Sequence, residues 1–160
     1  MPRLATLSEI HRKSMLMFPC LESDDTPWSP LRKPLDQAKL ALVTSAGIHL
    51  REDKPFIGDP HGGDTSYRII PSVVKAPDIL QSHVSIGFDH TAIMRDLNVT
   101  FPVDRLRELV DKGIVGSLAH NYYSFMGAIR NPKPLIEQSG PEVAQRLRDE
   151  GVDLVFLTPT

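Results

Sequence analysis

Cysteine is almost absent from this chain, since Cys20 is the only one among its 160 residues. A single cysteine cannot form an internal disulfide, and this excludes the small secreted proteins that depend on disulfides for stability. Cys20 also has no CxxC partner and no obvious charged neighbour that would activate it. We therefore interpret it as an inert or half-buried thiol.

Long apolar runs are also missing. No window of about 18 apolar residues occurs, so we expect no membrane-spanning helix. Residues 15–18 (MLMF) are too few for the apolar core of a signal peptide, and we predict a cytoplasmic protein. The formal net charge of −2 gives no electrostatic reason to expect a nucleic acid or an anionic membrane as a partner.

The usual motifs for nucleotides and metals do not occur either. The absence of GxGxxG and Walker patterns argues against nucleotide binding. His61 lies among acidic residues, but no HxH, HExxH or paired CxxC spacing accompanies it, and we expect no metal site. We predict no cofactor bound by this chain alone.

Proline, in contrast, is frequent, with 14 residues that gather in 19–34 and 55–77. Such segments are typically extended or looping. Thr6 and Glu9 fit a capping box, which predicts a short helix over about 7–17. We therefore divide the chain into an N-terminal helix with a proline-rich arm, residues 1–37, and an α/β domain, residues 38–160.

Strands and helices alternate in the second part. Residues 39–44 (KLALVT) and 153–157 (DLVFL) are almost continuously apolar, as in strands buried on both faces of a parallel sheet. Apolar side chains at helical spacing predict a helix over 103–112. A capping box at Ser139 begins a second helix, which ends at Gly151.

Three further strands are expected, and the first of them lies at an edge because its proline lacks a backbone donor: 66–71, 83–88 and 114–118. This order of elements predicts an α/β fold with a parallel, Rossmann-like sheet and helices on both faces. The last strand ends at Thr160, together with the sequence. Local features allow either a simple final strand or a fold whose C-terminal part is missing.

Five blocks of sequence resemble the glycine/sarcosine/betaine/D-proline reductase selenoprotein B family, in particular its D-proline reductase small subunits. The long and unusual block SHVSIGFDHTAIMRDLNVTFPVDRLRELVDKG (82–113) is the most specific of them. The others are WSPL (28–31), LALVTSAGIHLREDKPF (40–56), YYSFMG (122–127) and SGPEVAQRLRDEGVDLVFLTPT (139–160).

The resemblance implies a reductase subunit that lacks its nucleophile. In this family the strand matching DLVFLTPT leads into a selenocysteine-x-x-cysteine motif or its cysteine version, so Thr160 would directly precede the selenocysteine. The implied reaction is reductive cleavage of a C–N bond in a small amine or amino acid of the D-proline, glycine or betaine type. A dithiol or a redoxin would supply the electrons. A pyruvoyl group would come from a partner subunit, in an oligomeric assembly.

The chemistry of such a site is coherent. A selenol or thiol between a strand end and a helix N-terminus has its anion stabilised by backbone N–H groups and the helix dipole. A second thiol two residues later can resolve the adduct.

Candidate site residues follow the ends of the expected strands. Ser45 lets a loop approach a ligand, and His49 and Arg51 offer cations for a selenolate or a substrate carboxylate. A tight turn at Ser45 and a surface pair of His49 and Arg51 are the alternatives. These three residues are candidates for substrate binding.

A second group of candidates follows the expected strand 83–88. Asp89 beside His90 could position a general acid that protonates the leaving amine, with Asp96 and Asn98 binding substrate. The alternative is a loop network that caps the helix at 103. His120, after the strand 114–118, either orients a substrate or lies in a subunit contact. With Thr160, Asp89 and His90 are the catalytic candidates.

Two other functions fit the same residues. The protein could be a stand-alone selenol or thiol–disulfide oxidoreductase without a pyruvoyl partner, or a non-catalytic binding module. A neighbouring gene for a pyruvoyl proprotein favours the reductase complex. A monomeric, cooperatively folded 160-residue product favours the binding module.

Overall fold

The computed structural model describes residues 4–17, 24–58, 63–83 and 90–160. The chain forms two compact units, which divide between Pro30 and Leu31. The first unit contains a 3-10 turn, Leu4–Thr6, and α1 (Glu9–Leu16), which confirms the predicted helix. Its cap is Ser8, whose hydroxyl accepts a hydrogen bond from the backbone N–H of His11 (3.4 Å). The capping box at Thr6 was therefore placed two residues too early.

Residues 31–37, which we had assigned to the arm, lie within the second unit. The Lys33 ammonium pairs with the Asp153 carboxylate at 2.9 Å, and the Gly116 N–H donates to the Leu35 carbonyl at 3.0 Å. A 3-10 turn, Leu35–Gln37, then leads directly into the first strand of the sheet. The central strand is thus anchored at its start by the preceding segment.

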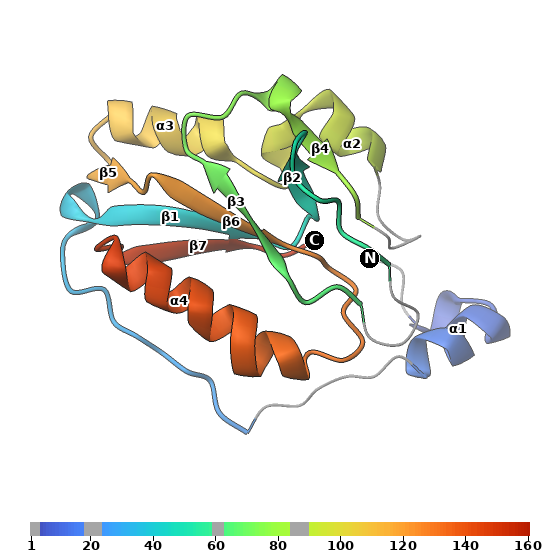
Figure 1. The fold of residues 1–160 in the computed structure, drawn as a ribbon. Helices are drawn as coiled ribbons and strands as arrows, with labels where there is room; N and C mark the ends of the chain where they lie inside the picture. The colour runs from blue at the N-terminus through green and yellow to red at the C-terminus, as the bar shows by residue number, and fades with distance from the viewer. Residues whose placement is uncertain (1–3, 18–23, 59–62, 84–89) are drawn as a thin grey trace. The chain divides into compact units, whose positions relative to one another are not determined.

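A mixed sheet forms the core of the second unit (Figure 1). Its central strand β1 (Lys39–Thr44) has β7 (Leu154–Thr158) parallel along one side. Along the other side run β5 (Ser117–Leu118) and then β6 (Asn121–Phe125), both parallel to β1. β3 (Tyr67–Pro71) completes the sheet antiparallel to β6, at the edge as predicted. The α/β class with a mostly parallel sheet is confirmed.

A small second sheet consists of the antiparallel strands β2 (Ile48–Leu50) and β4 (Ile79–Gln81). Three α-helices of the described chain belong to the same unit: α2 (His90–Arg95), α3 (Val103–Asp111) and α4 (Gly140–Asp149). A π-helical segment, Leu135–Ser139, directly precedes α4. Two 3-10 turns, Ala76–Asp78 and Leu97–Val99, lie next to β4 and α2.

Helices cover both faces of the main sheet. Successive residues of a strand point to opposite faces, so Tyr122 and Tyr123 mark the two sides of β6. Tyr122 packs edge-on against Phe101, just before α3, with ring centroids 5.8 Å apart. Tyr123 contacts Tyr67, whose hydroxyl donates to the Glu142 carboxylate of α4 at 2.6 Å. α3 and α4 therefore lie on opposite faces.

The helix boundaries follow their end signals in part. α3 ends at Lys112 and Gly113, which has φ +68°, as its glycine predicted. α4 buries Val143 and Leu147, also as predicted. The capping box at Ser139 is wrong, because the Ser139 hydroxyl donates to the Thr65 carbonyl (2.6 Å) and the π-helical segment runs straight into α4.

Among the described helices and strands, four escaped the sequence analysis: β2, β4, α2 and β6. β6 lies where we expected only a loop after the strand 114–118, of which the structure keeps residues 117–118. The expected strand 83–88 falls mostly outside the described residues, and the described neighbour β4 ends at Gln81. In the described part of the chain, no helix has the length and apolar character needed to cross a membrane. The cytoplasmic location stays a prediction.

Candidate functional site

The parallel strands end close together, and Ser45 and Thr160 meet there. The Ser45 N–H donates to the Thr158 carbonyl at 3.2 Å, which continues the pairing of β1 with β7. The Ser45 hydroxyl then accepts a hydrogen bond from the Thr160 N–H at 2.8 Å. Two of the predicted site residues, 115 positions apart, thus lie in direct contact at the carboxyl edge of the sheet, where open α/β sheets bind their ligands.

A network of hydrogen bonds between threonines stabilises this edge of the sheet. The buried Thr44 hydroxyl donates to the Thr100 carbonyl at 3.0 Å and accepts from the Ala46 N–H at 3.2 Å. The Thr158 hydroxyl donates to the same Thr100 carbonyl at 2.8 Å. Both strand ends are therefore tied to the loop that precedes α3, and the backbone that presents Ser45 is held firmly.

The side chain of His83 also lies close to Thr160, because residue 127 is a glycine. A Cβ on residue 127 would overlap with Nε2 of His83 and would lie 2.7 Å from the Thr160 carbonyl oxygen and 3.1 Å from that of Ser45. These three atoms therefore surround the space that the missing side chain leaves. The sequence analysis named no role for His83, because we read it as the first residue of a strand.

His83 is buried, with 6% of its surface exposed. Burial lowers the pKa of its imidazole below the ordinary value, and the nearby His90 lowers that pKa further. The Gly47 backbone, at φ +63°, passes so close that a Cβ there would lie 3.2 Å from the His83 backbone. The neighbouring Ser82 N–H donates to the Gly47 carbonyl at 2.9 Å. The lowered pKa thus favours the neutral imidazole, and these backbone contacts fix the position of His83.

The predicted catalytic His90 lies on the border of this region. It begins α2, and its Nδ1 lies 2.9 Å from Oε1 of Gln81. The Gln81 amide in turn donates to the Ala46 carbonyl at 3.1 Å. This relay connects His90 to the residue after Ser45. Asp89, the other half of the predicted pair, lies outside the described residues.

His49 and Arg51 take different positions. His49 is 3% exposed; its Nδ1 donates to the Leu50 carbonyl at 2.7 Å and its Nε2 lies 2.8 Å from the Ser82 hydroxyl. Since the carbonyl can only accept, Nδ1 carries the proton. The Arg51 side chain is exposed and reaches the Pro77 carbonyl at 3.4 Å. His49 supports the residue beside His83, whereas Arg51 points elsewhere.

Asp96 and Asn98 form the capping network that we had considered as the alternative. The Asp96 carboxylate accepts from the Asn98 N–H at 2.9 Å, and the Asn98 side-chain oxygen accepts from the Asp104 N–H at 3.0 Å in the first turn of α3. Hydrogen bonds from Asn98 lower the pKa of Asp96. Their role in substrate binding stays a prediction.

The structure does not bring His120 to the carboxyl edge. His120 lies between β5 and β6, and its backbone N–H donates to the Glu150 carboxylate at the end of α4. This end of α4 precedes β7, so the pair lies toward the amino ends of the strands. Contact with the Ser45–Thr160 region is not observed.

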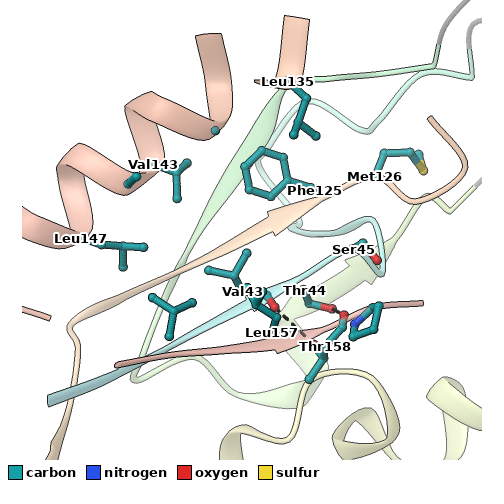
Figure 2. Close-up of a pocket in the computed structure, with 14 residues that line it drawn as sticks. Val43, Thr44, Ser45, Phe125, Met126, Leu135, Val143, Leu147, Leu157 and Thr158 are labelled. Atoms are coloured by element: carbon teal, nitrogen blue, oxygen red, sulfur yellow. Dashed lines mark hydrogen bonds between the residues drawn. The ribbon is translucent and has the colours of Figure 1, made fainter. Parts of the chain in front are cut away.

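An apolar cavity of about 460 Å³ opens beside Ser45 (Figure 2). Helix α4 and the carboxyl halves of β1, β6 and β7 form its walls. The apolar lining includes Val43, Phe125, Val143, Leu147, Val155 and Leu157. The polar side chains of the lining are those of Thr44, Ser45 and Thr158, at the carboxyl ends of β1 and β7. This cavity suits apolar side chains better than a charged amino acid.

Strand β7 also exposes apolar side chains, on both of its faces. Phe156 is 45% exposed and Leu157 is 66% exposed, and they point to opposite faces of the strand. A parallel strand is normally buried on both faces. Among the described residues, no three His, Cys, Asp or Glu side chains gather in a way that could hold a metal ion.

Comparisons with known proteins agree with the blocks that suggested a reductase. Residues 13–160 match the model of the family described as "Glycine/sarcosine/betaine reductase selenoprotein B (GRDB)". The chain belongs to this family. No solved structure is significantly similar to this selenoprotein B family member.

Among curated proteins, the D-proline reductase subunit gamma of Acetoanaerobium sticklandii is 40% identical over 131 residues, which cover 82% of this chain and 52% of that protein. The sarcosine reductase complex component B subunit beta of Peptoclostridium acidaminophilum is 29% identical, with coverages of 89% and 33%. The glycine reductase complex component B subunit gamma of Symbiobacterium thermophilum is 28% identical, with the same coverages. The chain spans about half of the first relative and about a third of the others.

Proposed function

We propose that this chain is the N-terminal part of a subunit of a dithiol-dependent reductase, which cleaves a C–N bond of an amino acid or amine of the D-proline, glycine or betaine type. The nucleophile is a selenocysteine or cysteine that follows Thr160. The pyruvoyl group that activates the amine belongs to a partner subunit. Family membership supports the reductase, and the names of the relatives support a complex of several subunits.

The observation that carries this proposal is the contact between Ser45 and Thr160 at the carboxyl edge of the sheet. A residue after Thr160 begins its side chain within one peptide unit of this contact, because consecutive Cα atoms are about 3.8 Å apart. It would thus emerge where β1, β6 and β7 end, beside a buried imidazole. This is the place where an α/β sheet presents reacting groups.

The reaction balances with a dithiol as the only reductant. The C–N bond breaks and takes up two electrons and two protons, so that carbon gains a C–H bond and nitrogen leaves as an amine. The two thiols of the donor supply the two electrons and the two protons, and they become a disulfide. In between, the chalcogen of this subunit is bonded to the substrate carbon. A second thiol then attacks the chalcogen, the carbon leaves and takes up a proton, and the chalcogen–sulfur bond that forms is reduced by the donor dithiol.

The exposed apolar surface of β7 and the apolar cavity support a longer protein and a multi-subunit assembly. Phe156 and Leu157 would be covered by a further segment of the same subunit, and the cavity beside Ser45 would receive apolar side chains. Burial of such side chains is worth about 1.5–3 kcal/mol each. We therefore place the small substrate next to Thr160 and not in the cavity.

The test is expression of the full reading frame together with the neighbouring proprotein gene, followed by dithiol-dependent consumption of D-proline, glycine, sarcosine and betaine in separate assays. We expect one substrate to be consumed. Replacing the residue after Thr160 by alanine should abolish turnover, whereas C20S, which removes the one cysteine of residues 1–160, should not. A reading frame without selenocysteine or cysteine after Thr160, or turnover that survives the alanine variant, contradicts the proposal.

A further inference from the structure

We propose that His83 is the proton acceptor for the chalcogenol side chain that follows Thr160. This inference rests on the proposed function, because it requires a thiol or selenol at that position. It assigns a role to a residue of this chain that neither the sequence blocks nor the names of the relatives single out. The proton of the chalcogenol passes to Nε2 of His83, which leaves a chalcogenolate and an imidazolium.

The geometry comes from Gly127. Nε2 of His83 and the carbonyl oxygen of Thr160 both border the small space where residue 127 has no side chain. The carbonyl carbon of Thr160 bonds directly to the next residue, over a C–N distance of about 1.33 Å. Any side chain larger than hydrogen at position 127 would fill the space between the imidazole and that residue. Gly127 therefore keeps this path open.

The imidazole has the protonation state that an acceptor needs. Burial and the neighbouring His90 both keep the charged form unfavourable, so the pKa of His83 lies below its ordinary value. A neutral imidazole can take the proton of a thiol, whose ordinary pKa is about 8.5. Because burial disfavours an isolated imidazolium, the resulting charge is held as an ion pair with the chalcogenolate beside it, and this pairing lowers the pKa of the nucleophile.

The neighbouring histidines are less suited to this step. Both ring nitrogens of His49 are engaged, with the Leu50 carbonyl and the Ser82 hydroxyl. His90 reaches the region through Gln81, and its side chain belongs to the exposed start of α2. His83 alone among these three borders the space next to Thr160. The titratable side chain that lowers the pKa of His83 electrostatically is His90.

The test measures the reactivity of the nucleophile as a function of pH in the full-length protein, with cysteine at the position after Thr160, serine in place of the second thiol, and C20S as background. Iodoacetamide alkylation of the peptide that contains Thr160 is followed by mass spectrometry between pH 5 and 9. H83Q is compared with the parent and with H11Q, a matched change of an exposed histidine in the first unit.

We expect H83Q to raise the pKa of the thiol toward about 8.5 and to slow alkylation at pH 6.5 by roughly tenfold or more. H11Q should leave the profile unchanged. An identical profile in H83Q and the parent overturns the inference. If the peptide is alkylated normally but the complex reduces no substrate, the proposed function fails and the inference stands; if no thiol or selenol follows Thr160, both fail.

A second measurement needs no change at His83. In the parent protein, alkylation of the thiol removes the group that exchanges a proton with the imidazole. The NMR resonances of the His83 ring should therefore shift and lose one titration step, whereas those of His11 should not. Unchanged His83 resonances after complete alkylation overturn the inference, even where H83Q does not fold.

Discussion

The two ends of the parallel strands are built differently. At the amino end, polar groups bind one another: Asp153 accepts from the Lys39 N–H and the Lys33 ammonium, and Glu150 accepts from the His120 N–H. At the carboxyl end, the side chains of Ser45 and His83 surround the position that follows β7.

The two ends therefore have different roles: the amino end stabilises the fold, and the carboxyl end presents the reacting groups. The amino end uses its charges to hold β1, β7 and α4 in register, so changes there should affect unfolding. At the carboxyl end, changes in the side chains that border the open space beside Gly127 should affect reactivity more than folding, whereas the threonine network behind this space should affect stability. The following predictions test this division, in order of decreasing effect.

The glycines of the two ends offer the strongest contrast. In G116A the new Cβ would lie 2.7 Å from the Gln37 carbonyl carbon and 2.9 Å from Ala38 N, both of them backbone atoms that cannot turn away. We expect a loss of about 3 kcal/mol or more in the free energy of unfolding, measured by urea denaturation.

G127A is the matched variant at the carboxyl end. Its Cβ would overlap with the tip of the His83 side chain, which can rotate, and would also lie 2.7 Å from the Thr160 backbone carbonyl oxygen. Because only one of these two closest atoms belongs to the backbone, the loss of stability should be smaller than in G116A. The NMR signals of the His83 ring should move instead. Equal destabilisation by both variants would remove the distinction between the two ends.

The threonine network should matter almost as much as Gly116. T44V removes the hydroxyl that donates to the Thr100 carbonyl and leaves the buried Ala46 N–H without its acceptor. We expect a loss of about 1–3 kcal/mol in the free energy of unfolding. T44S keeps the hydroxyl and should recover most of it. If T44S is no better than T44V, the methyl group and not the network stabilises this edge.

The amino end should make stability depend on pH. Hydrogen bonds from the Lys39 backbone N–H and the Lys33 side chain lower the pKa of Asp153 below its ordinary value of 3.8. Its contribution is therefore present above that value and is lost as the pH falls through the lowered pKa. Urea midpoints measured from pH 6 to pH 2.5 should fall less steeply in D153N than in the parent. D36N, which changes a carboxylate in the 3-10 turn before β1, should follow the parent.

The smallest effect should come from Tyr122. Its hydroxyl is buried, has no hydrogen-bond partner among the described residues, and has a pKa that burial raises to about 12. Y122F should leave stability unchanged or raise it by up to about 1 kcal/mol in thermal unfolding. Y67F, which loses the hydrogen bond to Glu142, should lower it slightly. A clear loss in Y122F would indicate a partner for the hydroxyl.

The elements that local patterns specify were predictable. The apolar runs of β1 and β7 and the helical spacing of Val103 and Leu106 in α3 gave correct assignments. β6 was missed because its sequence, NYYSF, is polar in appearance, although four of its five residues are buried. Tertiary packing of tyrosines on both faces overrides that composition.

The candidate site was predictable where it depends on strand ends. Ser45 and Thr160 follow β1 and β7, so their meeting follows from parallel pairing. His83 could not be found in the same way, because its proximity depends on Gly127 and Gly47, which approach it from other parts of the chain. Glycines that approach the backbone and the ring of one histidine become informative only once the pairing of the strands is known.

The central position of β1 has a consequence for synthesis on the ribosome. Lys39 pairs with Ser117 and Leu40 with Leu154, which are 78 and 114 positions later in the chain. At translation rates of about 5–20 residues per second, roughly 6–23 seconds separate the synthesis of Leu40 from that of its last partner. During this interval the largely apolar strand β1 has a bare edge, and a nascent chain of this family is an expected client of ribosome-associated chaperones.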